Sequence, residues 1–202
     1  MSSSSPSFVE SERRALAELL SSLGPGAPTL CEGWDTAHLA AHLVVREFRP
    51  DALPGFGAEL LRPGNPLTSW SHRLEDRLRA SASYAEIVNR LRSGPPAWSP
   101  MAWPGLGSAL NTTEFAIHHE DVRRAQPGWA PRVLPSPSQD AVWGAAGLFG
   151  RRAAGKRGLV LRRTDAPGEK RFGDGGRTVE GEPMELLLWA SGRREVARVT
   201  VS

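Results

Sequence analysis

Three ionisable side chains share one face of a predicted helix over residues 111–125, NTTEFAIHHEDVRRA. At about 100° per residue, Glu114, His118 and Asp121 point along the apolar stripe, whereas His119 lies on the opposite side. Glu114 and His118 are four residues apart, so a carboxylate oxygen and an imidazole nitrogen lie one helical turn apart. Because a buried ionisable group is costly unless paired or ligated, the pattern indicates a divalent metal site, with Asp121 as the hydrogen-bond partner of His118.

A third ligand is required, and the segment DTAHLAAHLVVREFRP, residues 35–50, offers two histidines. His38 and His42 share one helical face, but His38 falls in the first turn after the expected N-cap, Asp35. We favour His42 because it lies deeper in the helix, although periodicity alone does not separate the two. Arg46, one turn beyond His42, is a candidate catalytic residue that could bind an anionic group of a substrate or thiol.

The metal interpretation has a simpler alternative. Glu114 and His118 could form an ion pair on a solvated face, with Phe115 and Val122 forming the buried stripe instead. A second helix with inward-compatible histidines favours the metal site, but the residue pattern alone leaves both interpretations open.

Other reactive side chains are interpreted as structural. Cys31 is the one cysteine of the chain, so it forms neither an intrachain disulfide nor a multi-cysteine zinc site. We expect it to anchor a loop, since a catalytic thiol would need a base such as His38. His72 is expected at the surface or in packing. Trp98 and Trp103 either line the mouth of a pocket or pack in the core.

Helices must position these residues in the first two thirds of the chain. Apolar periodicity, caps and glycine or proline stops predict a bundle of four helices over residues 8–130, the third being one long helix or two short ones. The predicted helices cover residues 8–24, 35–50, 67–94 and a segment that begins near 107–111 and ends before residue 127.

The sequence changes in character after residue 137. A fifth helix is predicted over residues 138–156, and further elements follow at shorter spacing. Strands are expected over 158–164, 177–181 and 195–202, with a helix over 183–193. We therefore predict a mainly α protein, a four-helix bundle followed by a small α+β domain over residues 137–202.

Two segments resemble a known family. The stretch LCEGWDTAHLAAHLVVRE, residues 30–47, resembles the second-helix signature of the DinB-like superfamily, in particular the mycothiol-dependent maleylpyruvate isomerase group. EFAIHHEDVRRA, residues 114–125, resembles the fourth helix of the same group. Together they are most similar to an actinobacterial subfamily described as metal-binding. The resemblance covers residues 10–130 well and the C-terminal unit more weakly.

The resemblance implies a DinB-like bundle in which His42, Glu114 and His118 bind a divalent metal, usually zinc, with Asp121 supporting His118. Three protein ligands and an open position form a catalytic type of zinc site. The implied function is a thiol-dependent transferase or isomerase, with mycothiol as co-substrate and a small electrophile as substrate. The alternative is a non-catalytic metal-binding or regulatory interaction protein. His38 departs from the group's pattern, which leaves a further ligand open.

Bulk composition limits the remaining classes. The chain has 202 residues, 40% of them hydrophobic and 23% charged, which is ordinary for a globular protein. Its net charge is +3, but basic and acidic residues are interleaved, so we expect no nucleic-acid partner. Without an apolar run near ~18 residues or a secretory signal, we expect a cytoplasmic monomer or homodimer with no membrane partner. The Ser/Pro-rich residues 1–7 are expected to be disordered.

Overall fold

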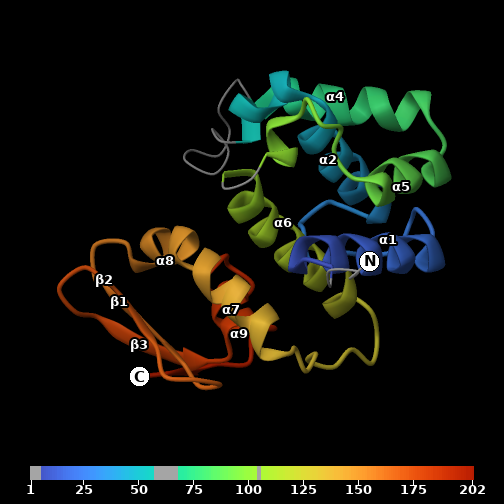
Figure 1. The fold of residues 1–202 in the computed structure, drawn as a ribbon. Coiled ribbons are helices and arrows are strands. Elements are labelled where there is room, and N and C mark those ends of the chain that lie inside the picture. The colour runs from blue at the N-terminus through green and yellow to red at the C-terminus, as the bar shows by residue number, and fades with distance from the viewer. Residues whose placement is uncertain (1–5, 57–67, 104–105) are drawn as a thin grey trace, which may run out of the picture.

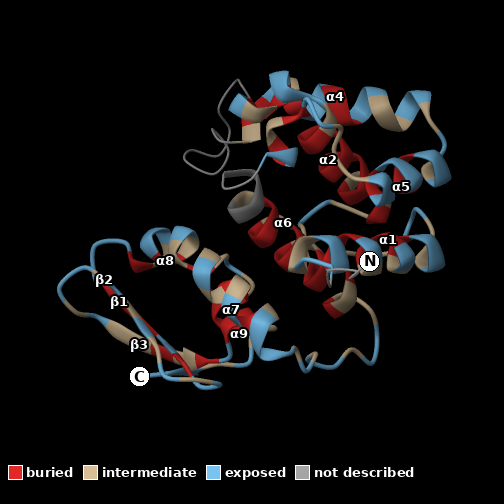
Figure 2. Ribbon diagram, viewed as in Figure 1, coloured by how far each residue is buried: buried red, intermediate tan, exposed pale blue. Residues whose placement is uncertain are grey.

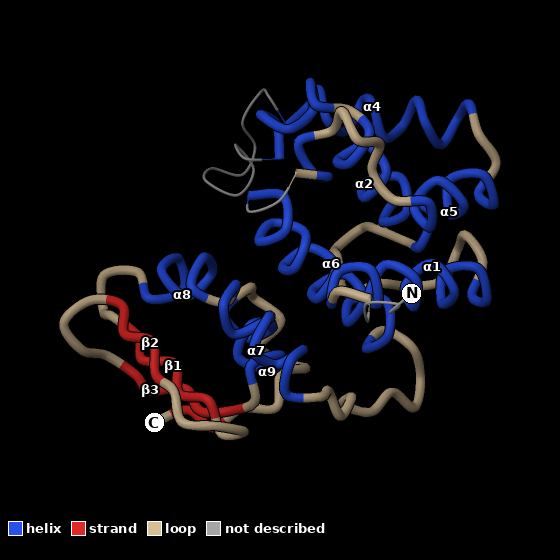
Figure 3. Tube along the Cα trace, in the orientation of Figure 1, coloured by secondary structure: helices blue, strands red, loops and turns tan. Residues whose placement is uncertain are grey.

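A computed structural model describes residues 6–56, 68–103 and 106–202 of the chain. Its N-terminal part is a group of packed helices, and its C-terminal part combines helices with a small sheet (Figure 1, Figure 3). The mainly α fold class, a helical bundle followed by a small α+β unit, is confirmed. The expectation of disorder at the N-terminus falls on residues 1–5, which lie outside the described residues.

The helical part contains five long helices among the described residues, joined by loops and short 3₁₀ turns. Residues 67–94, predicted as one helix or two, form two. The helices are α1 (Phe8–Leu23), α2 (Thr36–Phe48), α4 (Thr68–Ser81), α5 (Tyr84–Ser93) and α6 (Leu106–Arg124), with 3₁₀ turns η1 (Pro50–Ala52) and η2 (Pro100–Ala102).

Local capping explains where these helices begin and end. Asp35 caps α2 as predicted, accepting a hydrogen bond from the backbone N–H of His38 at 2.9 Å. Ser83 starts α5 with a capping box, which separates it from α4. Gly24 and Gly94 follow α1 and α5 with φ near 80°, a conformation that glycine adopts without steric cost.

Helix α6 carries buried side chains around most of its circumference. Phe115 and Val122 are fully buried in the core shared with α1, α2 and α5. Ile117 is buried on another side, against the C-terminal unit. The buried stripe of Phe115 and Val122 therefore exists, as the alternative interpretation required. It does not follow that Glu114 and His118 lie on a solvated face. The helix is enclosed on several sides, and Glu114 and His118 are only partly exposed on the side that faces His42 of α2.

The C-terminal unit contains more elements than the sequence predicts. The helix predicted over residues 138–156 is wrong as a single element, because it breaks at Ala146, between Gly144 and Gly147, and glycine disfavours a continuous helix. The elements are α7 (Ser136–Ala145), α8 (Gly147–Ala154), β1 (Leu159–Arg163), β2 (Glu169–Phe172), β3 (Arg177–Gly181), α9 (Pro183–Ala190) and β4 (Thr200–Val201).

The sheet has the strand order β2-β1-β3-β4, in which β1 and β3 are parallel and the other pairs antiparallel. Strand β2 was not predicted, since three of its four residues are charged and the strand buries little. The strand expected over residues 195–202 is reduced to Thr200 and Val201. The apolar side of the sheet packs against α8 and α9, which gives this unit its own core.

A third apolar cluster joins the two parts. It contains Ala116 and Ile117 of α6, Val142 of α7 and Leu187 of α9. Figure 2 shows buried residues along these three helices. Because these contacts connect residues 8–130 with residues 137–202, the division into two domains stays a prediction. No helix among the described residues is long and apolar enough to cross a bilayer.

Candidate metal centre

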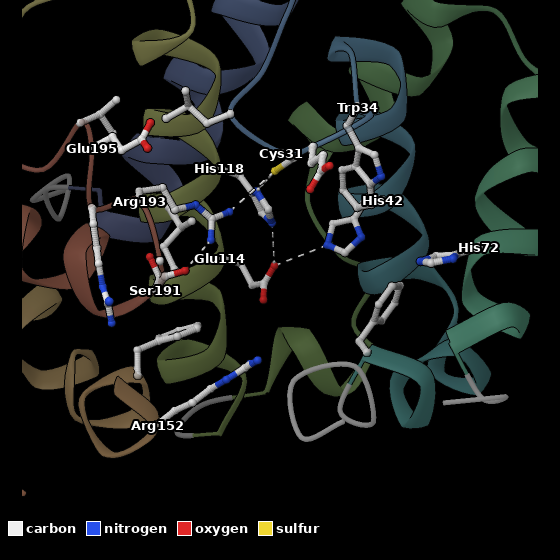
Figure 4. Close-up of a pocket in the computed structure, with 18 residues that line it drawn as sticks. Cys31, Trp34, His42, His72, Glu114, His118, Arg152, Ser191, Arg193 and Glu195 are labelled. Carbon is white, nitrogen blue, oxygen red and sulfur yellow. Dashed lines mark hydrogen bonds and ion pairs between the residues drawn. The ribbon is translucent and has the colours of Figure 1, made fainter. Parts of the chain in front are cut away.

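A cavity of about 840 Å³ lies between α2, α6 and the segment that follows α9 (Figure 4). Trp34, Phe56 and Ile117 contribute apolar wall on the helical side, and Phe149 does so on the C-terminal side. Arg152 and residues 191–196 form the rest of the C-terminal wall. A cavity of this size and mixed lining suits a small-molecule ligand.

Two imidazoles and one carboxylate converge in this cavity. Nε2 of His42 lies 3.6 Å from Oε2 of Glu114, and Nε2 of His118 lies 3.3 Å from the same oxygen. The ligand atoms of the three residues all lie within 4.8 Å of one another. The side chains of α2 and α6 that the sequence singles out are therefore brought to one point, and Figure 4 shows them facing each other.

The geometry of these three atoms fits a divalent ion. Tetrahedral coordination at about 2.0–2.1 Å separates neighbouring ligand atoms by about 3.3–3.4 Å, close to both observed distances. Among the side chains that the structure describes, Oε2 of Glu114 is the one buried nitrogen or oxygen atom without a hydrogen-bond partner. It lies within ion-pair distance of both rings but accepts a hydrogen bond from neither. A buried oxygen left without a partner is costly, and a cation would satisfy it.

His42 is held by a residue that the sequence did not single out. Its Nδ1 lies 3.0 Å from Oε1 of Glu75, which α4 supplies, and both side chains are at most about one-tenth exposed. The rings of Trp34 and Phe56 each lie 4.9 Å from the imidazole. A signal for Glu75 exists in the sequence: it lies four residues after Ser71 and next to Leu74, both buried, so helical spacing turns it toward the interior.

His118 is held from the other side by Asp121, as predicted. Its Nδ1 lies 2.9 Å from Oδ2 of Asp121. Arg193, from the segment after α9, donates to both oxygens of Asp121 at 2.9 and 2.7 Å. Cys31 lies beside them, its Sγ 3.2 Å from Oδ2 of Asp121 and 3.7 Å from Nδ1 of His118.

Cys31, His118 and Asp121 also lie close enough together to hold an ion. The guanidinium of Arg193 already occupies both carboxylate oxygens with a positive charge. A second cation beside it would be repelled, so this group fits a hydrogen-bond network that orients His118.

The second oxygen of Glu114 faces Arg46. Its Oε1 lies 3.7 Å from Nε of Arg46, whose Nη1 donates to Asn111 at 2.6 Å. Arg46 is buried, and it is not among the described side chains that line the cavity. The structure thus puts Arg46 behind Glu114, and its binding of a substrate anion stays a prediction.

Burial and charge act against each other at these groups. Burial alone would raise the pKa of Glu114, but the Arg46 guanidinium and the two imidazoles outweigh it and hold this pKa well below its usual value. For His118 and His42 the signs are reversed. Burial would lower the pKa of each imidazole, but the carboxylates beside each ring outweigh burial and raise both pKa values. The pKa of Asp121 is lowered to about 2, because hydrogen bonds from His118 and Arg193 outweigh its burial.

No family model and no curated protein sequence matches the chain. Two solved structures match it over 96% of this chain and 90% of theirs. One is the mycothiol-dependent maleylpyruvate isomerase, with a TM-score of 0.55 and 20% identity. The other is a histidine-to-alanine variant of an enzyme of that name, with a TM-score of 0.61 and 18% identity.

The chain has the fold of the mycothiol-dependent maleylpyruvate isomerase. The resemblance expected from the two sequence segments is confirmed for the fold, and the match extends through the C-terminal unit. The actinobacterial subfamily stays a prediction.

The remaining histidines of this chain lie outside the cluster of His42, Glu114 and His118. Nδ1 of His38 lies 2.7 Å from Asp35, and His38 belongs to neither group of described residues that could hold a metal ion. His119 faces away from the cavity as predicted, yet it is buried, with Nδ1 2.8 Å from Oε2 of Glu12. His72 is exposed at the rim of the cavity.

Cys31 and the two tryptophans differ from expectation. Cys31 does lie in its loop, but its thiol lines the cavity and its neighbours are Asp121 and His118 rather than His38. Trp98 and Trp103 are 59% and 56% exposed, so neither packs in the core. Neither is among the described residues that line the cavity.

Proposed function

We propose that this chain is a divalent-metal-dependent enzyme. It either transfers a low-molecular-weight thiol to a small electrophilic substrate or uses the thiol to isomerise that substrate. The observation that carries the proposal is the convergence of His42, His118 and Glu114 inside a cavity of small-molecule size. The fold supports it, because both matching structures are described as mycothiol-dependent isomerases.

In this proposal His42, Glu114 and His118 hold the ion, for which zinc is the expected identity. A bound divalent ion stabilises a thiolate at neutral pH and so supplies a nucleophile. Trp34 and Phe56 place apolar rings beside His42, and an apolar wall strengthens electrostatic interactions at this end of the cavity. Mycothiol is the proposed thiol, and a small electrophile is the proposed substrate class.

Metal analysis of the purified protein tests the site. We expect about one equivalent of zinc in the wild type and a large loss in His42→Ala. His38→Ala is the matched control, since it removes a histidine from the same helix face outside the cluster, and it should retain the metal. Wild-type protein that takes up no divalent ion would sink the proposal.

A conjugation assay tests the chemistry. Zinc-loaded protein is incubated with a mycothiol analogue and a panel of electrophiles that includes maleylpyruvate, and product formation is followed by mass spectrometry. We expect thiol-dependent turnover of at least one electrophile, lost in His118→Ala. Full metal loading without turnover would instead indicate the alternative, a non-catalytic metal-binding or regulatory protein.

A further inference from the structure

Glu75 is a buried carboxylate whose contact with His42 brings a third helix of the bundle to the candidate metal centre. Its Oε1 lies 3.0 Å from Nδ1 of His42, and its side chain is 9% exposed. Glu75 comes from α4, whereas His42 comes from α2 and the other ligand candidates come from α6. Glu75 does not line the cavity, so a ligand in the cavity does not touch it.

The chemistry of this contact fixes the state of the ring. A carboxylate accepts hydrogen bonds and does not donate them, so Nδ1 of His42 carries the hydrogen. The lone pair of the neutral ring is then on Nε2, the nitrogen that faces Oε2 of Glu114 at 3.6 Å. Asp121 acts in the same way on Nδ1 of His118, at 2.9 Å, so both rings present Nε2 to the same point.

The two carboxylates differ in the partners that the described residues give them. Arg193 donates to both oxygens of Asp121, and its positive charge reduces the effect of that carboxylate on His118. The Oε1 oxygen of Glu75 instead faces the imidazole of His42 within a buried environment. A negative charge beside Nδ1 increases the electron density at Nε2 and makes the nitrogen a stronger metal donor.

We propose that Glu75 is a positioning residue that orients His42 and strengthens it as a metal ligand. The inference rests on the proposed function, because it takes His42 as a ligand of the ion. It adds α4 to the elements that build the centre. The residue acts through His42 alone and has no contact with substrate or thiol.

Cobalt(II) binding measures this role without reference to turnover. The metal-free protein is titrated with Co²⁺ against a competing chelator, and the visible absorption of the bound cobalt reports the ligand field. We expect Glu75→Ala to weaken Co²⁺ binding by about 10- to 100-fold, the range found for partners of metal-binding histidines. Glu75→Gln should lie between, because its amide oxygen still accepts from Nδ1 but carries no charge.

Asp76→Asn is the matched control on the same helix, since the Asp76 side chain is 70% exposed and its ion-pair partner is Arg79. It should bind Co²⁺ as the wild type does. Thermal unfolding of the metal-free proteins shows whether each variant is folded. In a His42→Ala background the further loss caused by Glu75→Ala should vanish, because the ring through which it acts is gone.

The outcomes separate this inference from the proposed function. Folded Glu75→Ala protein that binds Co²⁺ within twofold of the wild type overturns the role of Glu75, whatever the protein catalyses. The same loss in the presence and absence of His42 also overturns it, since the effect would not pass through the ring. If Co²⁺ affinity falls as expected but no thiol conjugation is found, the proposed reaction fails and the role of Glu75 stands. Wild-type protein that binds no Co²⁺ overturns both.

Discussion

At the scale of residues, the candidate site depends on the partners that hold its three candidate ligands in place. Each of the three candidate ligands has a partner on the side away from the point where they meet. Glu75 contacts His42, and Asp121 contacts His118. Glu114 has Arg46 near Oε1, which leaves Oε2 for the ion. Such support fixes the direction of a ligand before any ion binds, which favours affinity.

Replacing Glu114 tests the atom on which the site depends. Glu114→Gln removes the negative charge and substitutes a weaker oxygen or a nitrogen at the point of convergence. We expect the zinc content to fall at least tenfold, measured by elemental analysis after dialysis. Glu32→Gln is the control, because Glu32 lines the same cavity but is exposed and outside the cluster. Equal zinc in both variants would contradict the ligand role of Glu114.

At the scale of elements, buried polar contacts fix how the helices pack. Glu12 of α1 contacts His119 of α6 and Arg132 of the following loop, each at 2.8 Å. These hydrogen bonds outweigh the effect of burial and lower the pKa of Glu12 to about 2. His119, which the helical stripe places away from the cavity, therefore has a structural partner and joins two helices.

The low pKa of Glu12 predicts how stability depends on pH. A carboxylate with a pKa of about 2 when folded and 4.5 when unfolded stabilises the protein above pH 4.5 and loses this contribution as pH falls toward 2. The contribution is on the order of 3 kcal/mol. Urea unfolding should show Glu12→Gln less stable than the wild type at pH 6, with the difference shrinking toward pH 3. Glu18→Gln, an exposed change on the same helix, should show neither effect, and a constant difference for Glu12→Gln would refute the assignment.

At the scale of the whole molecule, the site depends on both parts of the chain. Arg193 comes from the segment after α9 and binds Asp121, which in turn holds His118. The two parts are also joined by Arg124 of α6, which donates to Glu185 of α9 at 2.6 and 2.9 Å. The C-terminal unit is thus part of the candidate centre as well as one wall of its cavity.

The ion pair of Arg124 and Glu185 should therefore contribute strongly to stability. Both side chains are buried, and Glu185→Ala removes two charge-assisted hydrogen bonds of Arg124, which keeps its ion pair with Glu120. Hydrogen bonds to charged groups contribute about 1.5–3 kcal/mol each, so the loss is on the order of 3 kcal/mol. We expect a loss of this size for Glu185→Ala in chemical unfolding. Glu180→Ala is the matched control, since Glu180 pairs with the half-exposed Arg162 and should cost about 1 kcal/mol or less. Similar losses in the two variants would show that Arg124 does not join the parts as inferred.

From the sequence alone, helical periodicity predicted the helices that carry the candidate site and the directions of their side chains. It gave the helices around His42 and His118, the cap at Asp35, and the shared direction of Glu114 and His118, because caps and 3.6-residue spacing are local properties. The fold class followed from the same pattern. The ligand roles of these residues stay predictions that the geometry supports.

Only the tertiary structure decided what lies opposite each face. It brought His42 rather than His38 to Glu114, gave His119 a buried partner, and moved Arg46 behind the cluster. It also added Glu75 and Arg193, which come from α4 and from the segment after α9. Periodicity gives the direction of a side chain relative to its own helix axis, whereas the atoms it meets depend on how separate elements pack.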